Sequence, residues 1–427
     1  MLDIKKIREN PQGVKDGLAA RGVDGAAVDE IIALDGVRRE KTAALQALQG
    51  ERNATSKKIG LAKRAGEDTS AIQAEMRTLG DKIDALDREV SAVDEKQRDI
   101  LLSLPNLPAP GVVPGGKEAN ETVAVWGEKP KFDGFEPKDH IELCASLGLI
   151  DYDRGVRMGG NGFWLYRGDG ARLEWALLNY FVQEHLKDGF EFILPPHLLS
   201  YECGLTAGQF PKFEEDVFRL REDGFQFLLP TAETALVNLH RGEILEEKDL
   251  PLKMFAYTPC YRREAGSYRK EERGMVRGHQ FNKVEMFAYT LPEQSDDVLK
   301  LLIRKACALV EGLGLHYRLS KLAAGDCSAS MATTYDVELW IPSMEIYKEC
   351  SSVSNAMDYQ ARRGNMRFRR AESKKVEFLH TLNGSGLATS RLLPAIVEQF
   401  QMADGSVEIP QVLRPFMGGQ THLKPRA

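Results

Sequence analysis

The N-terminal quarter of the chain carries a hydrophobic repeat in which spacings of four and three residues alternate. The repeat consists of Ile72, Met76, Leu79, Ile83, Leu86, Val90 and Val93, and it continues to Ile100 after the polar Gln97. Such spacings place apolar side chains along one stripe of an α-helix and are typical of a coiled-coil seam. The pattern therefore predicts a long helix that reaches about residue 103.

A weaker repeat precedes it, from about residue 27 to 63. Its apolar positions keep the same register but are interrupted by polar residues; they are Ile31, Leu34, Leu45, Leu48, Ile59 and Ala62. Gly66 breaks the pattern between the segments, and Asp68 or Thr69 is expected to cap the second helix. Because the connection is short, the helices must run antiparallel, as a hairpin on the order of 50 Å long. The pattern alone leaves a coiled coil between two chains as an alternative.

Residues 104–117 are rich in proline and glycine, which disfavours both helix and sheet. They predict a linker between an N-terminal domain, 1–103, and a second domain, 118–427. In the second domain, β-like runs at 163–166, 190–194, 254–257 and 284–289 alternate with amphipathic windows at 171–187, 231–241, 294–313 and 390–400. This succession predicts an α+β fold in which helices flank an antiparallel sheet.

Composition and cysteine usage favour an ordinary cytoplasmic protein. The chain is 43% hydrophobic and 28% charged, and no run approaches the roughly 18 apolar residues of a membrane span. The N-terminus lacks the apolar core of a secretion signal, so no membrane partner is expected. Six scattered cysteines form no C-x-x-C pair, which predicts reduced thiols and no zinc site.

The formal net charge of −6 is unevenly distributed. Residues 36–64 hold eight cations and two acids, whereas residues 65–100 hold ten acids and five bases. One side of the predicted hairpin is therefore a candidate surface for nucleic-acid phosphates. The cations closest to its tip are Arg52, Lys57, Lys58, Lys63 and Arg64.

The most distinctive chemistry lies between residues 261 and 285. Arg262, Arg263 and Glu264 precede a charged, glycine-bearing loop, after which come Arg277 and Phe281. Arginine beside a carboxylate, a second arginine and an aromatic residue in this order make a candidate site for a nucleoside triphosphate. A cross-strand ion pair is the alternative for Arg262 and Glu264 taken alone.

This stretch resembles motif 2 of the class II aminoacyl-tRNA synthetases. Gly384 to Arg391 looks like the glycine-rich motif 3, and Gly189-Phe190 leading to Ile193 and Pro196 looks like motif 1, which implies a homodimer interface. Together with Thr231-Ala232-Glu233 and the predicted helical arm, these segments resemble the seryl-tRNA synthetases. The resemblance runs along essentially the whole chain.

The resemblance implies specific roles in ATP binding. Arg262 would bind the α-phosphate and the substrate carboxylate, with Arg263 beside it, and Glu264 would accept a hydrogen bond from adenine. Phe281 and Arg391 would stack on the two faces of adenine, and Arg277 would reach the outer phosphates. Arg262, Arg391 and Glu349 are the expected catalytic residues. The segment Glu349-Cys350-Ser351-Ser352 looks like the family's Glu-x-Ser-Ser element, in which Glu349 and Ser352 would bind Mg²⁺, a cation that prefers oxygen ligands.

Serine recognition is likewise implied by the resemblance. Thr231, Ala232 and Glu233 would hold the substrate's amino group, whereas Glu285, Asn383 and Ser385 would line the side-chain pocket. Thr231 has an alternative role as a helix cap. Thr333, Cys350, Ala356, Ala388 and Ser390 depart from the commoner family pattern and put the fine shape of the pocket in doubt, although none removes an assigned charge.

The implied reactants are ATP with Mg²⁺, L-serine and tRNA(Ser), with tRNA(Sec) left open as a second substrate. Two other functions stay open at this point. One is an enzyme that passes an activated amino acid to a carrier protein; the predicted arm argues against it. The other is a non-catalytic nucleic-acid-binding module; the intact set of charged residues argues against that.

Overall fold

The computed structural model describes residues 1–221, 224–264 and 274–426. The chain separates into two compact units, Leu2–Pro105 and a larger unit that consists of Met1 and Asn106–Ala427. In the part of the chain that is described, no helix combines the length and apolar character that a membrane span requires.

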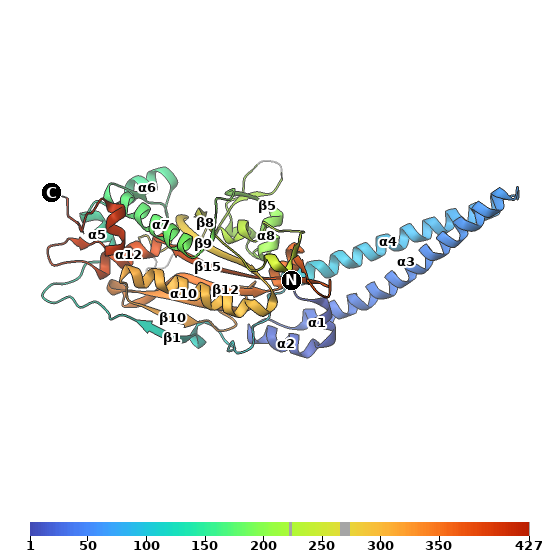
Figure 1. Ribbon diagram of the computed structural model, residues 1–427, viewed down its shortest axis with the longest axis horizontal. Coiled ribbons are helices and arrows are strands. Elements are labelled where there is room, and N and C mark those ends of the chain that lie inside the picture. The colour runs from blue at the N-terminus through green and yellow to red at the C-terminus, as the bar shows by residue number, and fades with distance from the viewer. Residues whose placement is uncertain (222–223, 265–273, 427) are drawn as a thin grey trace. The chain divides into compact units, whose positions relative to one another are not determined.

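The smaller unit is entirely helical and contains the predicted hairpin. Its helices are α1 (Ile4–Glu9), α2 (Pro11–Ala20), α3 (Ala26–Arg64) and α4 (Ser70–Ser103). Helices α3 and α4 lie side by side and antiparallel (Figure 1). Leu45 of α3 packs against Leu79 and Ile83 of α4, as the heptad pattern predicts. The polar Gln97 is tolerated in the seam because its side chain donates a hydrogen bond to the Ile31 carbonyl at 3.1 Å.

Charges on the hairpin are partly paired between its helices. Lys41 forms an ion pair with Glu89, and Arg38 lies 3.7 Å from Asp94. Two of the eight cations in residues 36–64 are therefore neutralised by α4. The start of α4 follows Asp68, whose Oδ1 accepts the Ser70 amide at 2.9 Å, whereas the side chain of Thr69 makes no capping hydrogen bond.

The larger unit is built on an eight-stranded sheet with the order β1-β10-β11-β12-β15-β9-β8-β4. All neighbours are antiparallel except β4 and β8, so the predicted antiparallel sheet carries one parallel edge strand. The strands are β1 (Glu121–Trp126), β4 (Glu191–Ile193), β8 (Leu252–Tyr261), β9 (Gln280–Thr290), β10 (Tyr317–Lys321), β11 (Thr333–Ile341), β12 (Ile346–Met357) and β15 (His380–Ala388).

Smaller elements surround this sheet. The helices of the larger unit are α5 (His140–Ser146), α6 (Tyr152–Gly159), α7 (Asp169–Lys187), α8 (Tyr201–Ala207), α9 (Glu233–Leu236), α10 (Ser295–Leu313), α11 (Tyr359–Gly364) and α12 (Thr389–Gln399). The short strands are β2 (Ile150–Asp151), β3 (Leu165–Tyr166), β5 (Leu198–Ser200), β6 (Gln226–Leu228), β7 (Ile244–Glu246), β13 (Arg367–Arg369), β14 (Val376–Phe378), β16 (Val407–Glu408) and β17 (His422–Leu423).

The two faces of the large sheet have different characters because side chains alternate along each strand. On β9, Val284 and Met286 join a core formed with α7, α10 and α12. Lys283 and Glu285, at the intervening positions, point to the opposite face, as do Asp336 and Glu338 of β11. The first face is the main hydrophobic core, and the second provides the floor of a cavity.

The helical windows predicted at 171–187, 294–313 and 390–400 are confirmed by α7, α10 and α12. The window at 231–241 is wrong in extent, because α9 covers only Glu233–Leu236. Beyond it the Asn238 side chain binds the carbonyls of Thr234 and Cys203, and the chain continues in turns. The run at 163–166 contributes only β3, which pairs with β2 outside the large sheet.

Candidate active site

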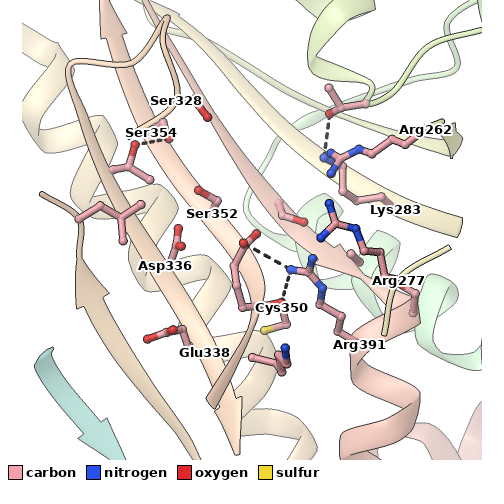
Figure 2. A pocket seen from close by; sticks show the side chains of 18 of the residues that line it. Arg262, Arg277, Lys283, Ser328, Asp336, Glu338, Cys350, Ser352, Ser354 and Arg391 are labelled. Atoms are coloured by element: carbon pink, nitrogen blue, oxygen red, sulfur yellow. Dashed lines mark hydrogen bonds and ion pairs between the residues drawn. The ribbon is translucent and has the colours of Figure 1, made fainter. Parts of the chain in front are cut away.

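A cavity of about 1150 Å³ opens on the second face of the sheet. Its floor comes from β9, β10, β11, β12 and β15, and its walls come from the segments around Thr231 and Arg277. Figure 2 shows arginine and lysine side chains on one side and the carboxylates and hydroxyls of β11 and β12 on the other. Most of the residues assigned from the sequence converge here.

Arg262 follows the last residue of β8 and lies against Phe281 of β9. Its guanidinium carbon is 5.3 Å from the centre of the Phe281 ring, and its Nε donates to the Pro230 carbonyl at 3.3 Å. Hydrogen bonds with His279 tie the backbones of the two segments together. The β8–β9 hairpin therefore brings the cation and the aromatic ring of the predicted nucleotide site together.

Glu264 and Arg277 form a close ion pair, with Arg277 Nε 2.5 Å from Glu264 Oε2. Glu264 has a left-handed backbone, with φ of 48°, which is unusual for a residue other than glycine. Both side chains line the cavity. The charged loop that the sequence places between them, 265–273, lies outside the described residues.

Arg391 lies in the first turn of α12 and contacts Glu349 of β12. Its NH1 donates to the Glu349 carbonyl at 2.6 Å and lies 3.3 Å from the Glu349 carboxylate. Desolvation opposes ionisation of Glu349, but the charges of Arg391, Arg262 and Lys283 outweigh it and lower the pKa of this carboxyl. Glu349 is therefore an anion held beside cations.

A buried polar cluster lies deeper in the cavity. Lys283 Nζ is 2.7 Å from the Thr231 hydroxyl and 2.5 Å from the Glu285 carboxylate. The same hydroxyl accepts the Glu233 amide at 3.3 Å, although Ala232 and not Thr231 occupies the N-cap position of α9. The charge of Glu285, which is only 1% exposed, is matched by that of Lys283.

Glu233 and Asn383 complete this cluster. The Asn383 amide donates to Glu233 at 3.2 Å and to Glu285 at 3.1 Å, and Gln360 donates to Glu233 at 2.8 Å. Burial and the neighbouring charge of Glu285 raise the pKa of Glu233 to about 7. A cation placed beside Glu233 would reverse this shift.

Two buried oxygen atoms of the cluster have no hydrogen-bond partner among the described residues. They are Oδ1 of Asn383 and Oγ of Ser385, both on β15. Unpaired buried polar atoms are costly, so these oxygens indicate where a polar ligand belongs.

Hydroxyls and carboxylates of β11 and β12 form the opposite side of the cavity. The strand register pairs Ser352 with Asp336 and Glu349 with Glu338. A bulge between these pairs accommodates Cys350, which is 2% exposed and lines the cavity. Burial and nearby carboxylates raise the pKa of Asp336 well above its ordinary value.

Of the residues assigned to ATP or serine binding, three do not line the cavity: Arg263, Ala232 and Ser351. Arg263 donates to the Glu215 carbonyl at 2.9 Å, and Ser351 donates to the Ser385 carbonyl at 2.6 Å. Of the positions that depart from the family pattern, Cys350, Ala388 and Ser390 line the cavity, whereas Thr333 and Ala356 do not.

The cations assigned to tRNA binding lie on α3. Among described residues, the exposed side chains of Arg52, Lys57, Lys58, Lys63 and Arg64 have no acidic partner.

Lys283, Gln360 and Asp336 belong to the site but were not assigned from the sequence. Lys283 lies two residues before Glu285 on the same strand. Because alternate residues of a strand lie on the same face, the sequence could have predicted that Lys283 joins Glu285 in the site. Gln360 and Asp336 gave no local signal, because only the register of β11 and the packing of α11 bring them here.

Comparison with known proteins identifies the family of this chain. Residues 1–108 match the seryl-tRNA synthetase N-terminal domain, and residues 218–400 match the tRNA synthetase class II core domain (G, H, P, S and T). Serine–tRNA ligase 2 of Clostridium acetobutylicum is 58% identical over 98% of this chain and 99% of its own. The chain belongs to the seryl-tRNA synthetase family.

Other relatives of this synthetase extend along its whole length. Serine–tRNA ligase of Akkermansia muciniphila is 47% identical over 98% of both chains. The crystal structure of seryl-tRNA synthetase from Pyrococcus horikoshii complexed with ATP covers 100% of both chains with a TM-score of 0.92 and 35% identity. The cytoplasmic enzyme of Naegleria fowleri in complex with AMP gives a TM-score of 0.88 at 29% identity, covering 100% of this chain and 99% of its own. The family and fold class expected from the sequence are confirmed.

Proposed function

We propose that this synthetase is a serine–tRNA ligase that activates L-serine with ATP and transfers it to the 3′-terminal ribose of tRNA(Ser). The observation that carries the proposal is the convergence of a nucleotide-type site, formed by Arg262, Phe281 and Arg391, with a buried polar pocket around Glu285 in one cavity. The Pyrococcus relative, crystallised with ATP, supports a nucleotide in this fold.

The first step is attack of the serine carboxylate on the α-phosphorus of ATP, with loss of pyrophosphate. It requires alignment of two anions and stabilisation of negative charge more than it requires a base. Arg262 is placed to bind both anions, and Phe281 and Arg391 are suited to the two faces of adenine. Arg277 would exchange its partner Glu264 for the outer phosphates, which would free Glu264 for the adenine amino group.

The polar pocket is suited to a small amino acid that carries a hydroxyl. Glu233 and Thr231 would bind the ammonium group, and Glu285, Asn383 and Ser385 would bind the side-chain hydroxyl. Asn383 Oδ1 and Ser385 Oγ have no hydrogen-bond partner in the free protein. Alanine and glycine lack a side-chain hydroxyl and would leave these atoms without a partner, so the pocket would reject them.

Glu349 and Ser352 fit a Mg²⁺ ion, since both present oxygen atoms to the cavity from one strand. When bound, the ion would neutralise phosphate charge and help orient the leaving group. Within the chain itself, Arg391 holds Glu349 in its ionised form.

A homodimer is supported by an apolar surface on α7, β4 and the residue that follows β4; the segment that resembles motif 1 contains β4. Trp175, Leu186, Phe192 and Leu194 are exposed there by 57%, 45%, 38% and 71% respectively. Exposed apolar side chains at a sheet edge favour pairing with a second copy. The thiols of all six cysteines are free, which favours a reducing compartment such as the cytoplasm.

Recognition of tRNA is assigned to the α3–α4 hairpin through the exposed cations Arg52, Lys57, Lys58, Lys63 and Arg64. These groups would bind phosphates of the tRNA body while the 3′ end enters the cavity. The presence of the hairpin disfavours the carrier-protein alternative.

The proposal is tested by charging purified tRNA(Ser) with labelled serine. We expect an ester that appears only with ATP and is absent when periodate has destroyed the terminal ribose diol. A parallel reaction with tRNA(Sec) tests the second substrate. Failure to charge tRNA(Ser) under conditions that support a related synthetase would contradict the proposal.

A further inference from the structure

Asp336 is a buried carboxylate whose role the assignments above leave unexplained. It lies on β11, faces the cavity and is 9% exposed. Its Oδ1 has no hydrogen-bond partner among the residues that the structure describes. Figure 2 shows it below Ser352, on the side of the cavity opposite the arginines. A buried carboxylate of this kind is costly unless something compensates its charge.

The acids around Asp336 have compensating partners. Glu338, two residues along the same strand, accepts from Arg318 at 2.7 Å and from Ser320 at 2.6 Å. Glu349 is paired with Arg391, and Asp326 accepts from Asn120 at 2.7 Å. Among the described residues, Asp336 has no cation within ion-pair distance.

Ser352 links Asp336 to the predicted cation site. The two residues are directly opposite in the β11–β12 register, and both line the cavity. A hydroxyl that donates its proton to a carboxylate keeps its oxygen lone pairs for another partner. Asp336 lies where its carboxylate can accept the Ser352 hydroxyl proton, which would leave the Ser352 oxygen free to bind a cation.

We propose that Asp336 is the third side chain of the divalent-cation site, in addition to Glu349 and Ser352. One of its oxygens orients the Ser352 hydroxyl, and the other, now without a partner, is offered to the cation or to a water molecule bound to it. The inference rests on the proposed function, because it assumes that ATP enters this cavity with a divalent ion.

The test measures Mn²⁺ binding rather than activity alone. Free Mn²⁺ is followed by electron paramagnetic resonance as it is titrated into the full-length protein with α,β-methylene-ATP. We expect Asp336→Asn to weaken Mn²⁺ binding about 10- to 100-fold, as is usual when a group that orients a ligand is lost. Asp336→Glu should recover most of the affinity. Glu408→Gln removes a carboxylate that does not line the cavity, so it should change Mn²⁺ affinity less than about twofold.

Three outcomes are decisive. Equal Mn²⁺ affinity in wild type and a folded Asp336→Asn would overturn the role of Asp336 while leaving the synthetase function intact. Absence of Mn²⁺ binding by the wild type with the ATP analogue would overturn both. If Asp336→Asn does not fold, Asp336→Ser replaces it, and unchanged affinity in that variant would count equally against the proposal. In serine-dependent exchange, high Mg²⁺ should restore the rate of Asp336→Asn but not that of Arg391→Ala.

Discussion

The guanidinium of Arg391 donates to the Glu349 carbonyl at 2.6 Å and lies 3.3 Å from the carboxylate of the same residue. Arg391 lies in the first turn of helix α12, whereas Glu349 lies on β12, so one side chain connects the motif 3 segment with the predicted cation site. Binding of ATP would place phosphate and adenine next to this pair. The contacts with Glu349 therefore hold the Arg391 side chain where ATP is expected to bind.

Loss of either arginine should slow adenylate formation. Arg262→Ala and Arg391→Ala are each expected to reduce serine-dependent ATP–pyrophosphate exchange by about 10²- to 10⁴-fold, because each removes charge stabilisation from the transition state. Both variants should keep the wild-type sedimentation coefficient and circular dichroism spectrum. Exchange close to the wild-type rate in either variant would show that the nucleotide site is assigned incorrectly.

Glu285→Ala should impair the use of serine far more than the binding of ATP. Loss of a buried charged hydrogen bond to the substrate costs about 2 to 4 kcal/mol, on the order of 30- to 1000-fold in kcat/KM for serine. Removing the carboxylate also leaves Lys283 without its 2.5 Å partner, so thermal unfolding must be measured alongside. If ATP affinity fell while the serine dependence stayed the same, Glu285 would belong to the nucleotide site.

Serine use should depend on the ionisation of Glu233. Its pKa is raised to about 7 by burial and by Glu285, so in the free enzyme it is largely protonated below this pH. The substrate ammonium group needs the carboxylate form, and kcat/KM reports the free enzyme. We expect kcat/KM for serine to rise with pH and to level off above about 7.

Glu233→Gln is the control for this pH dependence. It should give a lower kcat/KM that no longer rises through the same range. Glu174, whose pKa is also raised to about 7 by burial, is unchanged in this variant. An unaltered profile in Glu233→Gln would therefore assign the titration to another group.

Shortening the arm should separate the two halves of the reaction. Replacing residues 41–92 with a glycine-serine turn removes Lys41 and Glu89 together and keeps the hydrogen bond from Gln97 to Ile31. Serine-dependent exchange should survive, whereas charging of tRNA at about 0.15 M salt should collapse as phosphate contacts are lost.

A matched pair of variants tests the charge of the arm itself. Reversal of Lys57, Lys58, Lys63 and Arg64 to glutamate should weaken tRNA charging and reduce its salt dependence. Exchanging lysine and arginine at the same four positions preserves the charge and should have little effect. Equal charging by the two variants would remove the tRNA-binding role from these residues.

Much of the fold was predictable because its signals are local. The heptads of α3 and α4, and the amphipathic helices α7, α10 and α12, follow from residue spacing alone. Strands β11 and β12 were not predicted, although β11 carries a strand signal. Its apolar Tyr335, Val337, Leu339 and Ile341 alternate with residues such as Asp336 and Glu338, as a strand with one buried face requires.

Residues of the site could be predicted from the sequence only where they belong to short motifs. Arg262, Phe281 and Arg391 were found through the family resemblance, and the β8–β9 hairpin explains why Arg262 and Phe281 meet. Lys283 had a readable signal in its spacing from Glu285. Asp336 had none, since its approach to Ser352 depends on a strand register that no local pattern specifies.

The most direct test of the central claim is amino-acid-dependent ATP–pyrophosphate exchange with serine, threonine, alanine, glycine and cysteine. Serine alone should support strong exchange, since only its hydroxyl fits the small pocket formed by Glu285, Asn383 and Ser385. Alanine and glycine would leave these groups unpaired, and threonine would have to place an additional methyl group there. Strong exchange with another amino acid and little with serine would contradict the account.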